Sequence, residues 1–345
     1  MPCERQTGPE GRSDRAGTVS QIRLRVAGRA PARYGTFMRI HRDTTYLDDA
    51  DRGATVAIGN FDGVHLGHQA VLRQAAQAAE APLGVVTFEP HPREYLMPEA
   101  GPFRLMNAEA RANRLEKLGV VHLYELAFNA ALAALSPEAF ARDILAERLG
   151  LAHVTVGRDF CFGHGRAGTA ADLVDFGERF GFGVTIAELV ETGGIEVSST
   201  QIRAALAEGR PRDAAMMLGH QHRIEGVVEQ GDQRGRDLGY PTANMSITGL
   251  HPPKFGVYAV KVDVLTGDNA GRYDGVASLG VRPMFGENIP NFETHVFDFR
   301  GDLYGAQLSV ALVEYLRPEE KFDGLEALIT QMDADSAQAR AILAA

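Results

Sequence analysis

The hydrophobic pattern of this chain changes character near Gly219, and that change constrains the fold more than any other feature. Between residues 55 and 219, short apolar runs alternate with amphipathic segments. Alternating strands and helices are typical of a parallel sheet with helices on both faces. After residue 219, short strand-like runs recur between turn residues, as in a small β-barrel. We therefore expect an α/β domain followed by an all-β domain.

The expected strands of the first domain are residues 55–59, 83–88, 121–126, 153–157 and 183–189. Its expected helices are 67–79, 107–118, 136–149, 170–180, 200–208 and 211–218. The second domain is expected to hold strands at 223–229, 256–264, 274–279, 293–299 and 308–316, and a terminal helix at 323–344. The pattern predicts domains over residues 38–219 and 220–345.

Residues 1–37 mix Arg, Gly, Pro and Ser without a hydrophobic period. Such a composition predicts disorder. The Arg content is compatible with a targeting peptide. A mis-assigned start is an equal alternative, because the structured pattern opens at Met38.

Composition excludes several classes of function. The formal net charge is −10, whereas a nucleic-acid binder wants a basic surface. No apolar run reaches the roughly 18 residues of a membrane span. The two cysteines, Cys3 and Cys161, cannot form a disulfide framework, which fits a reducing compartment. We expect a cytoplasmic protein with no nucleic-acid or membrane partner, either a monomer or a weak homo-oligomer.

The string GNFDGVHLGHQ, residues 59–69, joins the first expected strand to the first expected helix. Open α/β sheets bind ligands at such junctions. Its glycines allow close approach of the backbone to a phosphate. His65 and His68 lie one helical turn apart and can donate hydrogen bonds to a phosphate during transfer. The alternative is a surface turn with two solvated histidines, or half of a metal site.

The string SSTQIR, residues 198–203, precedes another expected helix. Ser198, Ser199 and Thr200 can simply cap that helix. Their hydroxyls and the first N–H groups can instead hold a nucleotide phosphate, with Arg203 one turn further on as a cation.

A third string, GDQRGRDLGYPTAN, spaces Gly231, Gly235 and Gly239 four residues apart, as in a flexible loop over a phosphate. Thr242 and Asn244 then offer hard oxygen ligands suited to Mg²⁺. Taken alone, the PTAN segment is equally well a turn.

The string NFETHVFDF, residues 291–299, predicts a strand in which Glu293 lies on the opposite face from Phe292. A carboxylate beside aromatic residues is partly desolvated, which suits a general base. The alternative is an ordinary carboxylate on the barrel surface.

The H-x-G-H signature is similar to that of the nucleotidylyltransferase superfamily. The longer string GNFDGVHLGH, with TFEPHP, LSPEAF, VGRDFCFGHGRAG and VSSTQIR, resembles the bacterial bifunctional riboflavin kinase/FMN adenylyltransferase family. The resemblance covers nearly all of residues 38–345, with the motifs in family order. It implies a Rossmann-like nucleotidylyltransferase domain followed by a small riboflavin-kinase barrel with a C-terminal helix.

The resemblance implies two reactions: ATP phosphorylates riboflavin to FMN, and a second ATP adenylylates FMN to FAD with release of pyrophosphate and help from Mg²⁺. It implies catalytic roles for His65, His68, Arg203 and Glu293. In the first domain, the implied nucleotide- and flavin-binding residues are Gly59, Asn60, Phe61, Asp62, Gly63, Asn129, Asp159, Ser199 and Thr200. In the second they are Gly231, Gly235, Gly239 and Pro241, with Thr242 and Asn244 toward the metal.

Two details depart from the resemblance or leave it open. Arg158 and Cys161 stand where other residues are expected beside the flavin pocket. Asn129 matches a stretch near the family's substrate site but is equally well a helix cap.

Rival classes fit less well. The G-x-G-x-x-G match in GHGRAG would suggest a dehydrogenase, but DFCF separates it from its strand. A protein kinase is excluded because no lysine precedes Lys117. A class I tRNA synthetase is normally far longer. The alternatives kept are a single-activity mononucleotide adenylyltransferase with a non-catalytic flavin-binding barrel, and a flavin-binding module without catalysis.

Overall fold

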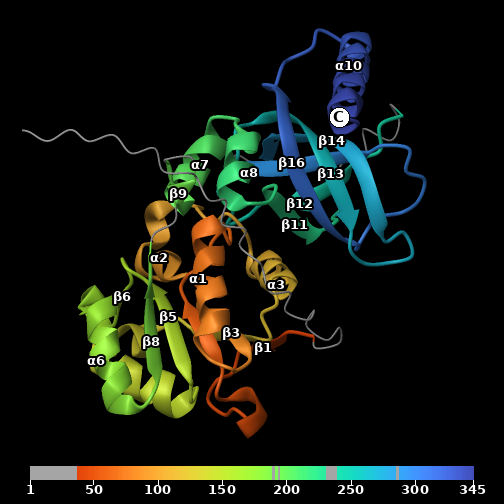
Figure 1. Cartoon of the computed structure of the whole chain (residues 1–345). Coiled ribbons are helices and arrows are strands. Elements are labelled where there is room, and N and C mark those ends of the chain that lie inside the picture. Colours follow the sequence, from red (N-terminus) through yellow and green to blue (C-terminus); the bar gives the residue numbers. More distant parts are fainter. Residues whose placement is uncertain (1–36, 189–190, 193–194, 231–238, 285–286) are drawn as a thin grey trace, which may run out of the picture. The chain divides into compact units, whose positions relative to one another are not determined.

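The computed structural model (Figure 1) describes residues 37–345 except 189–190, 193–194, 231–238 and 285–286. The disorder predicted for residues 1–37 falls almost entirely outside these residues. Within the described part of the chain, no helix is both long and apolar enough to cross a membrane.

The first domain is built on a six-stranded sheet in the order β1-β4-β3-β2-β5-β8. All five strand pairings in it are parallel. Its strands are β1 (Arg39–His41), β2 (Thr55–Ile58), β3 (Leu83–Glu89), β4 (His122–Ala127), β5 (His153–Gly157) and β8 (Gly183–Ala187). The chain runs from β2 outward to β4, then returns to place β5 on the other side of β2. Ligands bind at such a switch point in open α/β sheets, beyond the carboxyl ends of the strands.

Helices cover both faces of this sheet, as predicted. On one face, Val56 and Ile58 of β2 pack with Leu145 and with Leu173 of α6 (Ala170–Phe180). On the other face, Ala57 packs beneath α1 (Leu66–Ala78) and α3 (Ala108–Lys117). Successive residues of a strand point to opposite faces. The uninterrupted apolar run of β2 therefore supplies both cores.

The remaining helices of this domain are α2 (Pro92–Leu96), α4 (Ala130–Ala133), α5 (Pro137–Ala139), a π-helical segment (Phe140–Arg148), α7 (Ser199–Ala207) and α8 (Pro211–Leu218). Short strand pairs are formed by β6 (Cys161–Phe162) with β7 (Gly168–Thr169), and by β9 (Glu191–Thr192) with β10 (Ile195–Glu196). The predicted helix over 136–149 is thus present, with its N-cap at Ser136 and a proline in the first turn.

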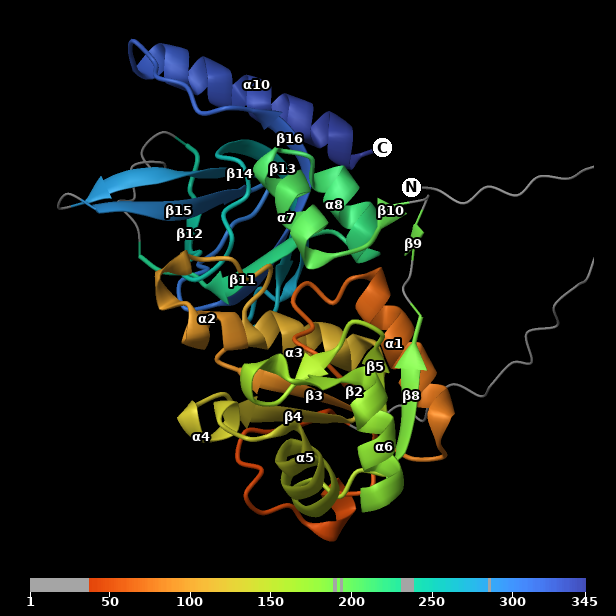
Figure 2. The ribbon, with the colours of Figure 1, turned by 90° about the vertical axis from the view of Figure 1, so that its left-hand side faces the viewer.

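The second domain is an antiparallel six-stranded sheet in the order β11-β16-β13-β14-β15-β12. Its strands are β11 (Arg223–Val227), β12 (Ala243–Ser246), β13 (Gly256–Val264), β14 (Gly271–Met284), β15 (Glu287–Val296) and β16 (Gln307–Arg317). A bridge between Glu229 and Asn244 joins the two edges, which nearly closes the barrel (Figure 2). Its core is a cluster that includes Tyr258, Val260, Leu279 and Phe292.

Helix α10 (Leu325–Leu343) lies against the outside of this barrel. Asp335, which is buried, accepts hydrogen bonds from Arg317 of β16 at 2.7 and 2.9 Å. Ala339 packs with Phe297 and Ala259. Phe297 therefore faces the helix while Phe292 faces the barrel interior, in agreement with the predicted period of two.

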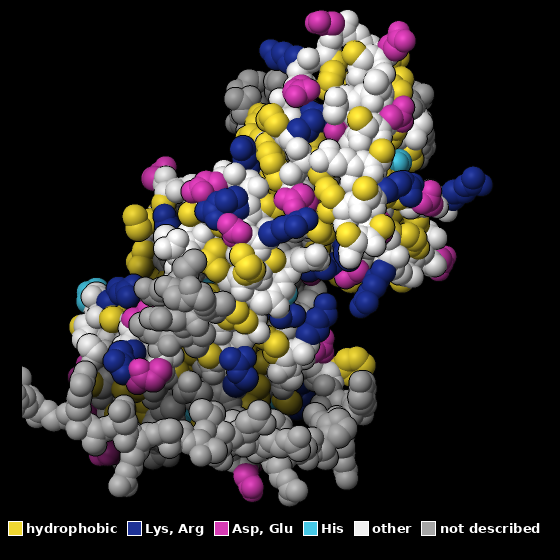
Figure 3. All heavy atoms as spheres, turned by 45° about the horizontal axis from the view of Figure 1, so that its top comes forward, with side chains coloured by type: hydrophobic (Ala, Val, Ile, Leu, Met, Phe, Trp, Pro, Cys, Tyr) yellow, Lys and Arg dark blue, Asp and Glu magenta, His cyan; other side chains and the backbone are white. Residues whose placement is uncertain are grey.

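In the two six-stranded sheets, β1 and β12 were not expected from the sequence; the short strands β6, β7, β9 and β10 were not expected either. β1 has only three residues and lies at the sheet edge, so it carries no apolar alternation. β12 begins at Ala243, inside the PTAN segment, which taken alone could also be a turn. It becomes a strand because Ala243 and Asn244 pair with Thr294 and Glu293 of β15. On the face drawn in Figure 3, basic and acidic side chains are interspersed without a continuous basic patch.

Candidate active sites

His65 and His68 lie together at the N-terminus of α1, beyond the carboxyl end of β2. His65 is the N-cap residue, and its Nδ1 atom accepts a hydrogen bond from the His68 N–H at 3.3 Å. The two imidazole rings stack, with centroids 3.6 Å apart and planes 17° apart. The H-x-G-H spacing thus brings both rings to one face of the first helical turn, as predicted.

The loop before α1 is held in an uncommon backbone conformation. Phe61 and Val64 have φ angles of 52° and 43°. Positive φ is costly for such residues and persists where the surroundings impose it, often at functional sites. Gly67 leaves room for the first histidine, because a Cβ there would lie 3.0 Å from His65 Cε1. Gly63 has a φ of 86°, and a Cβ there would lie 2.8 Å from Leu105 Cδ1.

Both histidines are uncharged in this environment. Burial, and secondarily the positive charge of Arg203, lower the pKa of His65 to about 4. Burial also lowers the pKa of His68 well below its usual value. The Nδ1 atom of His68 is buried and has no hydrogen-bond partner among the described residues. These two neutral imidazoles, with the unpartnered nitrogen of His68, are suited to bind a polar or anionic group.

Asp62 joins the H-x-G-H loop to the SSTQIR motif. Its buried carboxylate forms an ion pair with Arg203 and accepts the Leu105 N–H at 2.7 Å. Its carbonyl oxygen accepts the Ser199 hydroxyl at 3.0 Å. Burial raises the pKa of Asp62, and Arg203 opposes that shift. The two motifs, more than 130 residues apart in the sequence, therefore form one site.

The ion pair with Asp62 and a second contact, to Phe103, fix the orientation of the Arg203 side chain. Its Nε donates to the Phe103 carbonyl at 2.6 Å, and its guanidinium lies 5.3 Å from the Phe103 ring centroid. Ser198 caps α7 by accepting the Gln201 N–H at 3.3 Å. Thr200 is exposed in the first turn of α7. The cap interpretation therefore holds for Ser198, while Ser199 and Arg203 point back to the H-x-G-H loop.

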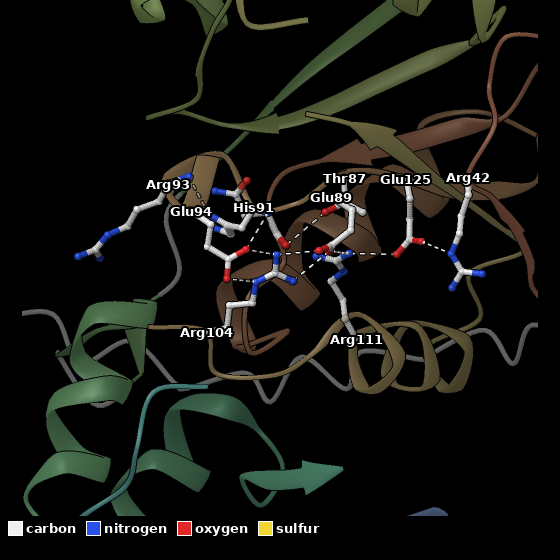
Figure 4. Close-up of polar contacts among 10 residues, drawn as sticks. Arg42, Thr87, Glu89, His91, Arg93, Glu94, Arg104, Arg111 and Glu125 are labelled. Carbon is white, nitrogen blue, oxygen red and sulfur yellow. Dashed lines mark hydrogen bonds and ion pairs between the residues drawn. The ribbon is translucent and has the colours of Figure 1, made fainter. Parts of the chain in front are cut away.

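A partly buried ladder of alternating charges includes Glu89 of the TFEPHP motif (Figure 4). Arg104 donates to Glu89 at 2.7 and 3.0 Å and to Glu94 at 2.6 Å. Arg111 bridges Glu89 and Glu125 at 3.0 Å each. The ladder ends at Arg42, whose Nε lies 3.1 Å from Glu125.

The ladder fixes His91 of TFEPHP beside the site. The backbone N–H of His91 donates to Glu94, and its side chain caps α2 by accepting the Arg93 N–H at 3.0 Å. Its ring meets Phe103 edge-on at 4.8 Å. Burial and the charge of Arg104 lower the pKa of His91 to about 4. We did not single out His91 from the sequence, and only its place in a family motif could have indicated it.

The other residues expected in this site lie at the carboxyl ends of neighbouring strands. The Asn60 carbonyl accepts the Thr87 hydroxyl at 3.3 Å, and the Asn60 side chain is exposed. Asn129 follows β4 and caps α4 by accepting the Leu132 N–H at 3.0 Å. Asp159 follows β5 and is exposed. No contact joins Asn129 or Asp159 to the histidines among the described residues, so their binding roles stay predictions.

Arg158 and Cys161, the two departures, lie in the same region. Arg158 is exposed and pairs with Glu188 at 2.6 Å. Cys161 is half-buried, and its thiol lies 3.6 Å from the Asp159 carbonyl.

In the barrel, Thr242, Asn244 and Glu293 converge between β12 and β15. Asn244 and Glu293 are paired residues of these strands. The Thr242 hydroxyl lies 3.3 Å from Glu293 Oε2. Asn291 donates to Glu293 Oε1 at 2.8 Å and lies 3.4 Å from Asn244 Oδ1. The register of two strands thus assembles the residues that the sequence separates by about 50 positions.

Asn291 was not expected as a site residue, although a period of two places it on the same strand face as Glu293. The Pro241 carbonyl oxygen lies 2.9 Å from Nδ1 of His295 on β15 and can accept a hydrogen bond from it. Gly239 has a φ of 81°, as a turn requires. Gly231 and Gly235 lie outside the described residues.

Comparison with known proteins identifies two family domains in the chain. The FAD synthetase family model matches residues 47–201, and the riboflavin kinase family model matches residues 218–343. A Pseudomonas fluorescens protein named bifunctional riboflavin kinase/FMN adenylyltransferase is 43% identical over 311 residues, which is 89% of this chain and 98% of the relative. An Escherichia coli K12 protein of the same name is 36% identical over 307 residues, 88% of this chain and 97% of the relative.

The chain belongs to the bifunctional riboflavin kinase/FMN adenylyltransferase family. The prediction of an enzyme with two catalytic domains is confirmed, because both family models match. The alternative of a single-activity adenylyltransferase with a non-catalytic barrel is not supported. Among solved structures, a Streptococcus pneumoniae protein described as a macrolide-efflux protein is similar, with 32% identity, a TM-score of 0.74, and coverage of 88% of this chain and 98% of that one.

Proposed function

We propose that residues 220–345 phosphorylate riboflavin to FMN with ATP, and that residues 38–219 transfer the AMP group of a second ATP to FMN. The observation that carries the proposal is the presence of two separate side-chain clusters suited to phosphate chemistry. One joins His65, His68 and Ser199 through Asp62 and Arg203. The other joins Thr242, Asn244 and Glu293.

In the adenylyl transfer, an FMN phosphate oxygen attacks the α-phosphorus of ATP and pyrophosphate leaves. We assign His65 and His68 to the negative charge that shifts between the phosphates during this step. A neutral imidazole donates one N–H, and an approaching polyphosphate favours its protonated form. Arg203 and the N-terminus of α7 add positive charge to the same place. Positioning and charge stabilisation are sufficient here, without a covalent enzyme intermediate.

In the kinase reaction, Glu293 accepts the proton of the riboflavin 5′-hydroxyl as that oxygen attacks the γ-phosphorus of ATP. The bond from the γ-phosphorus to the bridging oxygen breaks, and ADP leaves. Asn291 and Thr242 both bond to the Glu293 carboxylate, which fixes its orientation. A carboxylate oriented in this way presents a lone pair to the substrate hydroxyl at little entropic cost.

The oxygen-rich cluster in the barrel fits a magnesium ion. Thr242 and Asn244 offer a hydroxyl and an amide oxygen, the hard donors that Mg²⁺ prefers alongside substrate phosphates. When bound, Mg²⁺ supplies charge neutralisation on the phosphates of ATP. We propose that Thr242 and Asn244 hold it.

We further propose a cytoplasmic enzyme that acts as a monomer or weak homo-oligomer and uses small molecules alone as partners. A net charge of −10 argues against a nucleic-acid partner. The low cysteine content fits a reducing compartment.

One experiment tests the whole proposal. The purified chain is incubated with riboflavin, ATP and Mg²⁺, and the flavins are separated by chromatography over time. FMN should rise first and then give way to FAD. If FMN alone accumulates, the adenylyl-transfer assignment fails. If riboflavin is not consumed but added FMN becomes FAD, the kinase assignment fails.

A further inference from the structure

A second histidine cluster lies away from both candidate active sites. His41 closes the edge strand β1, His122 opens β4, and Asp51 ends a helical turn that precedes β2. His41 Nε2 lies 3.2 Å from His122 Nδ1, and that same nitrogen lies 3.8 Å from Asp51 Oδ1. One ligand atom of each residue lies within 4.8 Å of the others. Neither reaction described above uses these side chains.

These distances suit a small metal ion. Zinc binds imidazole nitrogens at about 2.0–2.1 Å, so two such ligands in a tetrahedral shell lie about 3.3 Å apart. The two histidines already show that separation. A water molecule can complete the shell, since His41 is only half-buried.

Metal binding at this cluster needs both imidazoles in their neutral form, because only a neutral imidazole can ligate a metal. Without an ion, one proton bridges the two nitrogens; an ion in its place requires only that this proton move to the other nitrogen of its ring.

The surrounding contacts orient the ligands. Arg39 forms an ion pair with Asp51, and the Tyr124 hydroxyl donates to the Asp51 carbonyl at 2.6 Å. The His41 ring stacks on Tyr124 with centroids 5.0 Å apart. Metal-ligating carboxylates are themselves usually held by such hydrogen bonds. A donor set of two imidazoles and one carboxylate favours a first-row transition metal over Mg²⁺.

We propose that His41, His122 and Asp51 form a structural site for a transition-metal dication such as Zn²⁺. The ion ties the edge strand β1 and the turn before β2 to the amino end of β4. It lies at the amino ends of β2 and β4, whereas the H-x-G-H loop lies beyond the carboxyl end of β2. It therefore stabilises the first domain without contacting the substrates.

The test is calorimetric titration of Zn²⁺ into the chelator-treated full-length chain. Wild-type protein should bind Zn²⁺ at least tenfold more tightly than H41A, and Zn²⁺ should raise the melting temperature of the wild type but not of H41A. H164A removes an exposed histidine instead and should bind like the wild type. Retained FMN and FAD formation would show that H41A is folded.

The histidine pair of the H-x-G-H loop is the competing site, so the titration is repeated with H65A/H68A as the background. Binding that persists there and disappears when H41A is added supports the proposal. Equal affinity of wild type and H41A, or binding that is lost with His65 and His68, overturns it. Replacing Zn²⁺ by Co²⁺ gives a visible absorption band whose intensity reports four-coordinate nitrogen and oxygen ligation.

Discussion

At the scale of single residues, the two histidines of the H-x-G-H loop differ from histidines exposed to water. Their rings stack at 3.6 Å, and each is held neutral by burial. Such a pair is costly to protonate in the free enzyme. A bound polyphosphate reverses that balance, because negative charge close to an imidazole raises its pKa. In the proposed mechanism the imidazoles therefore gain positive charge when the substrate binds.

Replacing both histidines tests this. H65A/H68A should lower FAD formation from FMN at least about 100-fold, the loss typical of removed transition-state donors. FMN formation from riboflavin should stay near the wild-type rate, because the motif lies in the first domain alone. Flavin chromatography with each substrate measures both rates. Equal loss of the two activities would contradict the two-site assignment.

The barrel carboxylate gives the reverse prediction. E293Q keeps the shape of the side chain but removes its basicity, so riboflavin phosphorylation should fall about 10²- to 10⁴-fold. FAD formation from supplied FMN is the internal control and should be retained. A variant that still phosphorylates riboflavin at the wild-type rate would remove Glu293 from the role of base.

At the scale of elements, the charge ladder of Figure 4 joins several parts of the first domain through their side chains. It links β4 and β3 to α3 and to the segment that carries Arg104. Glu125 and Arg111 are almost fully buried, with side chains 3% and 4% exposed. A buried charge is tolerated only when it is paired, so each member of the ladder depends on its neighbours.

Removing one charged residue of the ladder should therefore strongly lower the free energy of unfolding. R111M leaves Glu125 buried with only the more exposed Arg42 as a charged partner, and we expect a loss of about 3–5 kcal/mol in the free energy of unfolding. The matched control is R158M, whose exposed pair with Glu188 should contribute less than about 1 kcal/mol. Urea unfolding followed by circular dichroism measures both. Similar losses in the free energy of unfolding for R111M and R158M would mean that burial does not determine how much the ladder's ion pairs contribute.

At the scale of the whole molecule, buried neutral histidines make the fold sensitive to acid. The pKa values of His65 and His91 are lowered to about 4, and that of His222 to about 3. The unfolded chain, with histidine pKa values near 6.5, binds more protons than the folded chain below that pH. Stability is therefore complete above about pH 6.5 and is lost as the pH falls toward 4.

We expect each histidine with a pKa near 4 to cost about 3 kcal/mol of folding free energy by pH 4. Urea unfolding measured between pH 7.5 and 4.5 tests this, because the midpoint should move to lower urea with acidification. H91Q removes one contributor and should show a shallower slope than the wild type. A midpoint that is constant or rises on acidification would contradict the assignment of neutral buried histidines.

Much of the architecture followed from local pattern. The five strands expected in the first domain and the five expected in the second are present, because each is an apolar run bounded by turn residues. What local pattern missed was set by pairing partners. β12 becomes a strand through β15, and the edge strand β1 is too short and polar to show a period.

The sequence by itself determined the order of the two domains and the type of sheet in each, and it predicted the reacting side chains. Hydrophobic period and motif chemistry are local properties, so they can be recognised from consecutive residues of the chain. The tertiary structure alone decided which of those side chains meet. Asp62 selects Arg203 across 141 positions, and the register of β12 against β15 brings Thr242 and Asn244 to Glu293. Such contacts depend on burial and on the register of strands that are distant in the sequence. A short stretch of sequence contains neither.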